Sequence, residues 1–332
     1  MTRGALVVAV ALALLATSQS LAATTLRITI QLPLSSPLGK NLVEFRDRVE
    51  RASPGGFDIQ IYPSAQLFAD KEVPAAVASG QIEMGVASLS RFAGTIPAVD
   101  VFSVPFLLHD EALVRAATAP GSPVRAPLDK AMTDKGARPL WWQPYGLSVL
   151  ATSGTLVRQP ADLAGMKIRT YGKALEQFVN LVGGAAANVS GEQQYLAYER
   201  GTVDGGLTGI LSVQERKLYQ VLDKLTLLHH SDIEFIVLIN ERLWQSLGAA
   251  EQTVLSEAAR AAEIALRDEF AALEQAALAE AEANGMEVYH LNDADVAAWR
   301  AATAPLSASF IDAAGPLGAE LVAAAESLGG AR

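Results

Sequence analysis

Polar and apolar residues alternate in three short segments of the first third of the chain, residues 26–30, 57–61 and 82–86. A period of two is typical of a pleated strand that turns one face toward a core. Between these segments, residues 42–49 and 73–77 place apolar side chains at helical spacing, which predicts helices. Strands that alternate with short helices favour a mainly parallel sheet with both faces covered.

The same two periods continue in the second half of the chain. Residues 166–169 alternate as a strand, residues 173–182 have helical spacing, and residues 185–189 predict another short strand. Residues 235–239 are continuously apolar, as expected of a buried strand that returns to the first domain. Residues 251–283 predict one alanine-rich helix, which at about 1.5 Å per residue reaches roughly 50 Å, enough to brace two domains.

The chain is long enough for two domains, because its 332 residues exceed the size at which a single core usually stops growing. We therefore predict an α/β protein with mixed, mainly parallel sheets, a cleft between two domains and a long bracing helix. Two chain crossings, near residues 147 and 231, would form a hinge. The expected parts are domain I at residues 24–146 with 232–250 returning to it, domain II at 147–231, the helix at 251–285 and a C-terminal packing segment at 286–332.

The first 23 residues have the pattern of a secretory signal peptide. Arg3 gives the positive start, residues 5–15 are apolar, and residues 20–22 form a small-x-small cleavage site, with Ala23 as an alternative. No later stretch approaches about eighteen uncharged apolar residues, and the sequence has no cysteine for lipidation or disulfides. We expect a mature protein that is free in a bacterial periplasm and not inserted in the membrane.

Composition argues against several classes of function. The net charge of −10 and the lack of a basic run argue against nucleic acid as a partner. Residues 205–209 are rich in glycine, but their spacing differs from nucleotide-binding fingerprints, so we predict a turn there and no cofactor. The four histidines have neither metal-ligand spacing nor a nearby nucleophile elbow. We therefore predict no metal site and no enzyme, and interpret His229 and His230 as structural.

Arg169 is the leading candidate for ligand binding. It ends the predicted strand and precedes the predicted helix, so it lies at the carboxyl edge of a sheet, where ligands bind in open α/β folds. Its planar fork of donors matches a carboxylate bidentately, which an ammonium cannot do. The alternative is an ordinary surface or salt-bridge arginine.

Other residues are candidates for the walls of a pocket. Ser88 and Arg91, in the loop after the third strand, could reach a solute or could belong to a solvated loop that caps a helix. Trp141 and Trp142 are adjacent, so in a strand they face opposite sides. One could line the cleft while the other packs in a core, and core packing of both is the alternative. Tyr171 is a further candidate for an aromatic wall.

Two motifs in the middle of the chain carry a resemblance to a known family. Residues 162–169 read Asp-Leu-Ala-Gly-Met-Lys-Ile-Arg, and residues 195–205 contain a Tyr-x-Ala stretch that ends in Gly-Thr-Val-Asp-Gly. The chain resembles the periplasmic solute-binding subunit of TRAP (tripartite ATP-independent periplasmic) transporters over most of residues 26–270. It departs from the family pattern at Tyr198, where leucine is usual. Further landmarks upstream are residues 62–67, 79–85 and 104–108.

The resemblance implies the two-domain periplasmic binding protein fold and a receptor that closes on a small organic carboxylate. It assigns the carboxylate to Arg169, and it matches Thr208 to a polar position that faces the ligand. Gln193 stands where the family often has glutamate, and it is a candidate to bond a hydroxyl or carbonyl of the solute, with a plain helix-start role as the alternative. Ser148 stands near the place where many members have a second arginine, and it is a further candidate for ligand contact. The family delivers its solute to a small and a large membrane subunit, and it uses an ion gradient rather than ATP.

Ser148 leads to a prediction about the ligand. With one fixed guanidinium, we expect a monocarboxylate with a hydrophobic or lightly hydroxylated body to bind more tightly than a dicarboxylate of equal length, unless Arg91 turns inward. The sequence alone leaves other functions open, namely the binding protein of an ABC importer or of a sensor, and a periplasmic hydrolase. Neighbouring genes for membrane subunits would separate the transporter classes.

Overall fold

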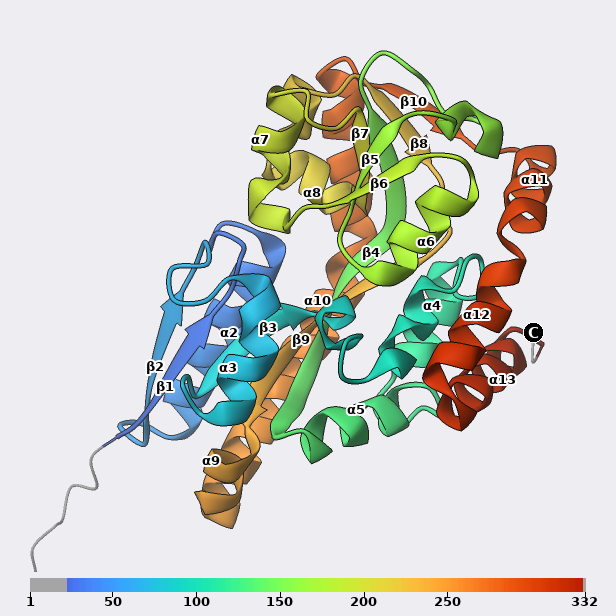
Figure 1. Cartoon of the computed structure of the whole chain (residues 1–332). Helices are drawn as coiled ribbons and strands as arrows, with labels where there is room; N and C mark the ends of the chain where they lie inside the picture. Colours follow the sequence, from blue (N-terminus) through green and yellow to red (C-terminus); the bar gives the residue numbers. More distant parts are fainter. Residues whose placement is uncertain (1–22, 331–332) are drawn as a thin grey trace, which may run out of the picture.

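Figure 1 shows the computed structural model, which describes residues 23–330. Two groups of strands and helices share one long strand, β4 (Ala137–Thr152), and one long helix, α10 (Ala249–Ala283), runs past both. Parallel and antiparallel pairs are mixed, so the predicted fold class is confirmed. The predicted signal peptide, residues 1–23, lies outside the described residues except for Ala23.

The first sheet contains β1 (Thr24–Thr29), β2 (Phe57–Tyr62), β3 (Met84–Ser88), β9 (Asp232–Asn240) and the first part of β4. Its order is β2-β1-β3-β9-β4. The pairs of β1 with β2 and β3 are parallel, whereas β9 runs antiparallel to β3 and β4. Leu26 and Ile28, at alternate positions of β1, are fully buried, as their period-two pattern predicts.

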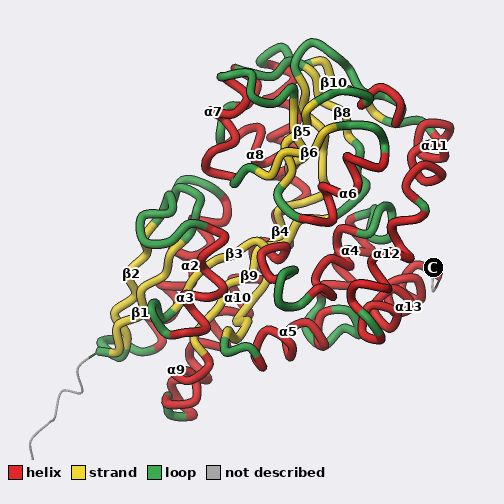
Figure 2. The backbone as a smooth tube through the Cα atoms, viewed as in Figure 1, coloured by secondary structure: helices red, strands yellow, loops and turns green. Residues whose placement is uncertain are grey.

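The second sheet contains the end of β4 together with β5 (Lys167–Thr170), β6 (Ala185–Asn188), β7 (Gly205–Gly209), β8 (Lys224–Leu227) and β10 (Glu287–His290). From β4 the order runs β7-β5-β6 on one side, and β8 then β10 on the other. The chain therefore reaches the second sheet through β4 and returns to the first through β9. Figure 2 shows β4 continuing from one group of strands into the other.

Helices cover both sheets. The α-helices are α2 (Pro37–Ala52), α3 (Val73–Ser79), α4 (Glu111–Thr118), α5 (Arg125–Asp134), α6 (Lys173–Leu181), α7 (Gln194–Glu199), α8 (Ile210–Glu215), α9 (Glu241–Ser246), α11 (Asp293–Thr303), α12 (Pro305–Ala314) and α13 (Pro316–Gly330). Short 3-10 helices are η1 (Asp70–Glu72), η2 (Leu89–Phe92), η3 (Pro97–Ser103), η4 (Pro160–Leu163), η5 (Gly191–Gln193) and η6 (Leu218–Gln220).

The long helix α10 contacts both groups of elements. It packs against α2 beside the first sheet and against α8 beside the second, and β4 lies under its middle. The C-terminal segment divides in the same way, because β10 extends the second sheet while α12 and α13 pack against η3 beside the first. Among the described helices, none is long and apolar enough to cross a membrane.

Trp141 and Trp142 face opposite sides of β4, as their adjacency predicts, but neither lines a cleft. Both are fully buried. The Trp141 ring lies 4.6 Å from that of Phe45, and the Trp142 ring lies 5.5 Å from that of Phe102. Because helices cover both faces of this part of β4, each indole enters a core. We therefore correct the expectation that one tryptophan lines the cleft.

The glycine-rich residues 205–209 form the buried strand β7 and not the predicted turn. Close packing explains the glycines. A Cβ at Gly206 would lie 2.1 Å from the Tyr198 hydroxyl, and one at Gly205 would lie 2.5 Å from the carbonyl oxygen of Ala151. The two strands beside β7 and the helix over it leave no room for side chains at these positions. Asp204, just before β7, accepts the backbone N–H of Lys167, the first residue of β5, at 2.7 Å.

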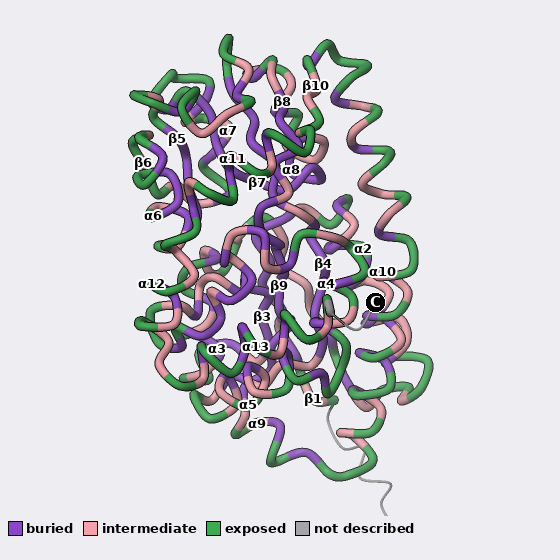
Figure 3. Tube along the Cα trace, turned by 90° about the vertical axis from the view of Figure 1, so that its right-hand side faces the viewer, coloured by how far each residue is buried: buried purple, intermediate pink, exposed green. Residues whose placement is uncertain are grey.

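The bend of β4 lies between the two sheets. Its pairing with β9 slips between Pro139 and Trp141 and again between Pro144 and Gly146, and Gly146 has a φ of +89°. Irregularities of this kind bend and twist a strand. Figure 3 shows that β4 and β9 are buried along most of their length at the centre of the molecule.

Candidate functional site

A pocket between the two sheets is formed where strand ends from both meet. The first sheet contributes the ends of β1, β3 and β9, the second contributes β5 and β7, and β4 passes between them. We call this space the central pocket. Its lining residues are Gln31, Asp70, Ser88, Arg91, Tyr145, Arg169, Tyr171, Gly191, Gln194, Thr208, Ser212, Arg216, Ile233 and Phe235.

Arg169 lies in the central pocket and is only 3 % exposed. Its Nε donates to the carbonyl oxygen of Val189 at 2.9 Å and its Nη1 to that of Leu207 at 2.8 Å. These bonds fix the plane of the guanidinium. No described carboxylate forms an ion pair with Arg169, and Nη2 has no described hydrogen-bond partner. Burial lowers the pKa of Arg169, because the charge has lost water without gaining an opposite charge.

Tyr171 stands beside Arg169, whose guanidinium carbon lies 5.1 Å from the centre of the tyrosine ring. Burial raises the pKa of Tyr171 to about 12, although the nearby hydroxyls of Ser148 and Ser231 act in the opposite direction. Ser148 is fully buried within the sheet, where its N–H donates to Ser231 and its strand pairs with β7. We therefore correct the expectation that Ser148 contacts a ligand, since it lies behind Tyr171 and does not line the pocket.

Arg91 turns inward, but its charge is already paired. Its Nε donates to Oδ2 of Asp70 at 2.5 Å, and Oδ1 of Asp70 accepts the backbone N–H of Ser88 at 2.9 Å. Asp70 is 1 % exposed, and burial raises its pKa even though Arg91 pulls the pKa down. The pair therefore forms a neutral wall of the pocket on the side of the first sheet.

Arg216, just after α8, is a third arginine in the pocket, and no sequence pattern singled it out. Its Nε donates to the carbonyl oxygen of Gly191 at 2.9 Å and its Nη1 to the Tyr145 hydroxyl at 3.2 Å. Its Nη2 lies 3.5 Å from Oε1 of Gln31, which belongs to the first sheet's side. Ser212, one helical turn earlier, also lines the pocket, so the spacing of four residues could have indicated a shared face.

Glu215 is the partner of Arg216. Its Oε2 accepts the Tyr145 hydroxyl at 2.8 Å and lies 3.7 Å from Nη1 of Arg216. Burial raises the pKa of Glu215 to about 7, although Arg216 lowers it in part. Of the three guanidinium groups in the pocket, two therefore have a carboxylate beside them, and Arg169 has none among the described residues.

Gln193 is exposed and does not line the pocket, whereas its neighbour Gln194 does. Gln194 is buried, and its Nε2 donates to Oγ of Ser212 at 2.7 Å. Gln194 and Tyr198 share one face of α7, because they are four residues apart, and the preceding position points outward. We correct the prediction by one residue, from Gln193 to Gln194.

The structure brings together five of the predicted candidates, namely Ser88, Arg91, Arg169, Tyr171 and Thr208. It also adds several residues that no sequence pattern singled out for the site. In the described part of the chain, the pocket lining includes no histidine, and no group of three or more His, Asp or Glu is placed to hold a metal ion. His230 is fully buried and stacks on Phe178 with ring centres 4.2 Å apart, a structural position as predicted.

Residues 29–313 match the family described as bacterial extracellular solute-binding protein, family 7. The chain is 30% identical over 294 residues to a "Solute-binding protein" of Verminephrobacter eiseniae, covering 87% of this chain and 85% of that protein. It is 27% identical over 325 residues to the C4-dicarboxylate-binding periplasmic protein DctP of Rhodobacter capsulatus, covering 97% and 96% of the two chains.

A solved structure has the same arrangement of elements. It is a TRAP periplasmic solute-binding protein from Polaromonas, bound to D-erythronate, with a TM-score of 0.85 and 26% identity. The match covers 92% of this chain and 98% of the other. Both domains and the connection between them are therefore included in the likeness.

Proposed function

This chain belongs to bacterial extracellular solute-binding protein family 7 and is a solute-binding receptor of the TRAP type, and we propose that Arg169 holds the carboxylate of its solute. Members of the family are periplasmic receptors for small organic acids, not enzymes, and work with TRAP membrane components. The proposal accordingly assigns binding, without catalysis, to the central pocket.

One observation supports this role above the others, which is the buried charge of Arg169 without a carboxylate partner. A buried ion without a counterion is costly, and a protein keeps one mainly where a ligand supplies the missing charge. Two backbone carbonyls hold the Nε and Nη1 groups in place. The remaining N–H groups of the fork can then donate to the two oxygens of a carboxylate.

The rest of the lining suggests what accompanies the carboxylate. Gln31, Gln194 and Thr208 can bond hydroxyl or carbonyl groups, while Tyr145 and Phe235 offer ring surface. Of the two bodies expected from the sequence, hydrophobic or lightly hydroxylated, this lining favours the lightly hydroxylated one. The relatives include receptors for dicarboxylates and for monocarboxylates. One is named for C4-dicarboxylates, and one holds D-erythronate, a hydroxylated monocarboxylate.

The charge pairing supports a monocarboxylate for this chain. The prediction based on Ser148 assumed a single guanidinium in the pocket, whereas the pocket holds three. Asp70 and Glu215 stand beside Arg91 and Arg216, so a single positive charge is left for the ligand. A second carboxylate would have to displace one of these internal partners.

A thermal-shift screen tests the carboxylate proposal. Mono- and dicarboxylates, keto acids, sugar acids and amino acids would be compared, each with its uncharged primary amide as a matched control. A ligand that binds only the folded state raises the melting temperature, and we expect at least one acid to do so while its amide does not. Equal shifts from acid and amide would show that the pocket does not recognise the carboxylate.

We further propose that the receptor closes about the bend of β4 and the start of β9. The moving bodies would be residues 24–146 with 232–250, and residues 147–231, with the helix at 251–285 and the segment 286–332 attached to both. Arg216 and Gln31 come from the two bodies and lie 3.5 Å apart in this structure, so opening of the receptor would separate them. Solution scattering with saturating acid should give a smaller radius of gyration, and an unchanged radius would indicate a preformed pocket.

The remaining assignments concern delivery. We propose that residues 1–23 direct export to the periplasm, and that the loaded receptor docks on a small and a large TRAP membrane subunit. Co-purification with both subunits in the presence of the acid tests the partners. Mass spectrometry of the mature N-terminus tests cleavage near Ala22 or Ala23, and an intact Met1 in the exported protein would contradict it.

A further inference from the structure

A second cavity lies on the opposite face of the strands that line the central pocket. Ile233 and Phe235 of β9 face the central pocket, whereas Asp232 lines the second cavity. Alternate residues of a strand point to opposite faces, so β9 separates the two spaces. We call this space the hinge cavity. The lining residues on which the site depends are Val114, Leu147, Asp232, Arg267, Phe270 and Glu274.

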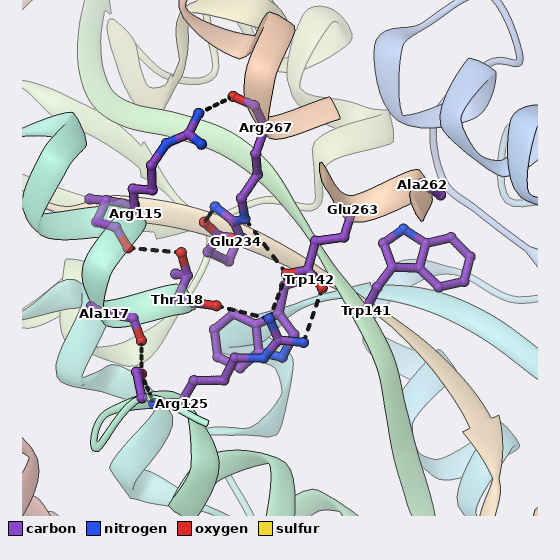
Figure 4. Close-up of polar contacts among 12 residues, drawn as sticks. Arg115, Ala117, Thr118, Arg125, Trp141, Trp142, Glu234, Ala262, Glu263 and Arg267 are labelled. Carbon is purple, nitrogen blue, oxygen red and sulfur yellow. Dashed lines mark hydrogen bonds and ion pairs between the residues drawn. The ribbon is translucent and has the colours of Figure 1, made fainter. Parts of the chain in front are cut away.

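The cations of the hinge cavity already have partners. Arg267 forms a double hydrogen bond to Glu234, at 3.0 and 2.9 Å, and lies 3.6 Å from Glu263. Arg115 is bound to Asp268 and to the carbonyl oxygen of Arg267. Figure 4 shows the guanidinium of Arg267 turned toward Glu234, and that of Arg115 beside the backbone of Arg267.

The network of ion pairs continues away from the cavity, and each guanidinium there has carboxylate partners. Arg125 donates to Glu263 at 2.5 Å and to Asp129 at 3.0 Å, as the lower part of Figure 4 shows for the first of these bonds. Glu263 therefore lies between Arg125 and Arg267, and each guanidinium has two carboxylates near it. The other acidic residues of the hinge cavity form no described ion pair, and the charge of Arg267 acts on Asp232 without forming one.

Three carboxyl groups of the cavity form no ion pair among the described residues, although the charge of Arg267 acts on one of them, Asp232. Asp232 is 6 % exposed, and its Oδ2 has no hydrogen-bond partner among the described residues. Glu274 is half-buried and accepts the backbone N–H of Leu147, but forms no described ion pair. Glu111 lies exposed at the rim, also without a described ion pair. Burial raises the pKa of Asp232 well above its usual value, and raises that of Glu274 to about 7.

We propose that the hinge cavity is a binding site for a small protonated amine, with the ammonium group between Asp232 and Glu274 and a short hydrocarbon body against Phe270, Val114 and Leu147. An ammonium has three donors and no acceptor, which suits two carboxylates that lack donors. The ring of Phe270 adds a surface that attracts cations. In the described residues no group of three or more acidic or histidine side chains is placed to hold a metal, so an organic cation fits better than a metal ion.

The charges around Glu274 set how this binding depends on pH. Glu111 and Asp232 repel the carboxylate of Glu274, Arg267 on the same helix attracts the carboxylate of Asp232, and His229 lines an adjoining cavity with Glu274. Arg115 also lines the hinge cavity but is held by Asp268. Below about pH 7 Glu274 takes up a proton and no longer attracts an ammonium. Amine affinity should therefore rise between pH 6 and pH 8.

Calorimetry with n-butylammonium chloride at pH 8 tests the site, with n-butanol as a neutral control of the same shape. We expect n-butylammonium to bind and n-butanol not to. Asp232→Asn and Glu274→Gln should each weaken binding at least tenfold, whereas Glu257→Gln, on the exposed side of α10, should leave it within twofold. Wild-type affinity should fall at least threefold from pH 8 to pH 6.

Two results would overturn the proposal. The first is no heat from n-butylammonium at millimolar concentration with wild type at pH 8. The second is binding that Asp232→Asn and Glu274→Gln leave unchanged, since the amine would then sit elsewhere. Circular dichroism of each variant separates loss of the site from loss of the fold. The test does not use the organic acid, so its result is independent of the role of Arg169.

Discussion

On one face of the β4 and β9 strands the central pocket contains the unpaired guanidinium of Arg169, and on the other face the hinge cavity contains the unpaired carboxyl groups of Asp232 and Glu274. Each cavity also holds ion pairs, Arg91 with Asp70 in the first and Arg267 with Glu234 in the second. The fold thus pairs buried charges on both faces. The two cavities differ in the groups that have no described ion-pair partner, which are basic in the central pocket and acidic in the hinge cavity. This difference indicates the kind of ligand that each cavity binds.

The largest expected effect comes from breaking the paired charges of the hinge cavity. Arg267→Met would leave the buried carboxylates of Glu234 and Glu263 without one shared cation. Loss of one partner of a buried ion pair typically costs about 3–5 kcal/mol. Urea unfolding should show a loss of this size. The partly exposed pair of Arg48 and Glu44 serves as control, and Arg48→Met should change stability by less than about 1 kcal/mol. Equal effects would mean that burial does not distinguish the two pairs.

A smaller effect is expected from the unpaired carboxyl group of Glu274, and it depends on pH. Its pKa is raised to about 7 in the folded protein, from about 4.5 when unfolded. The folded state then holds the proton more tightly, so this stabilisation is present below pH 4.5 and is lost as pH rises to 7. Wild type should therefore lose about 1–3 kcal/mol more than Glu274→Gln between pH 5 and pH 7.5. If the free energies of unfolding of the two proteins, measured in urea, changed equally with pH, this result would contradict the raised pKa of Glu274.

The single unpaired charge of the central pocket should limit the ligand to one carboxylate. For matched acids of equal length, we expect the monocarboxylate to bind about tenfold more tightly, which corresponds to roughly 1.4 kcal/mol. Competitive calorimetry gives this ratio directly. A preference for the dicarboxylate would mean that Arg216 or Arg91 leaves its internal partner for the ligand. Glu215→Gln would then strengthen dicarboxylate binding by freeing Arg216.

The smallest expected effect separates two neighbouring glutamines of the pocket wall. Gln194→Ala should weaken acid binding about threefold to tenfold, because the amide lines the pocket and holds Ser212. Gln193→Ala should leave binding within twofold, since that side chain is exposed. Calorimetry on both variants decides which of them belongs to the site. A larger loss for Gln193→Ala would restore the assignment made from the sequence.

The sequence predicted the parts of the fold that depend on short-range periodicity. The strand period at residues 26–30, the apolar run of β9 and the long alanine-rich helix each follow from side chains that repeat along one element. Residues 205–209 could not be assigned this way. Their glycines are required by Tyr198 and by the neighbouring strand, and these contacts arise only when the sheet assembles.

The sequence predicted which residues line the pocket where a motif fixes their position, as at Arg169 and Thr208. Pocket residues were missed where their position depends on tertiary contacts. In the sequence, Arg216 belongs to a polar and charged run that is typical of a protein surface. Only its hydrogen bonds to Gln31 and Tyr145 show that it faces the pocket. The alternation of Trp141 and Trp142 correctly predicted opposite faces, but the sequence could not show that helices cover both.

The most direct test of the account is calorimetry of the best-binding acid with Arg169→Lys. Lysine keeps the charge but cannot reproduce two parallel hydrogen bonds, and hydrogen bonds to charged groups contribute about 1.5–3 kcal/mol. We predict a loss of affinity of at least tenfold, with the far-ultraviolet circular dichroism spectrum unchanged. An Arg169→Lys protein that binds the acid within twofold of wild type would contradict the assignment of Arg169 as the carboxylate anchor.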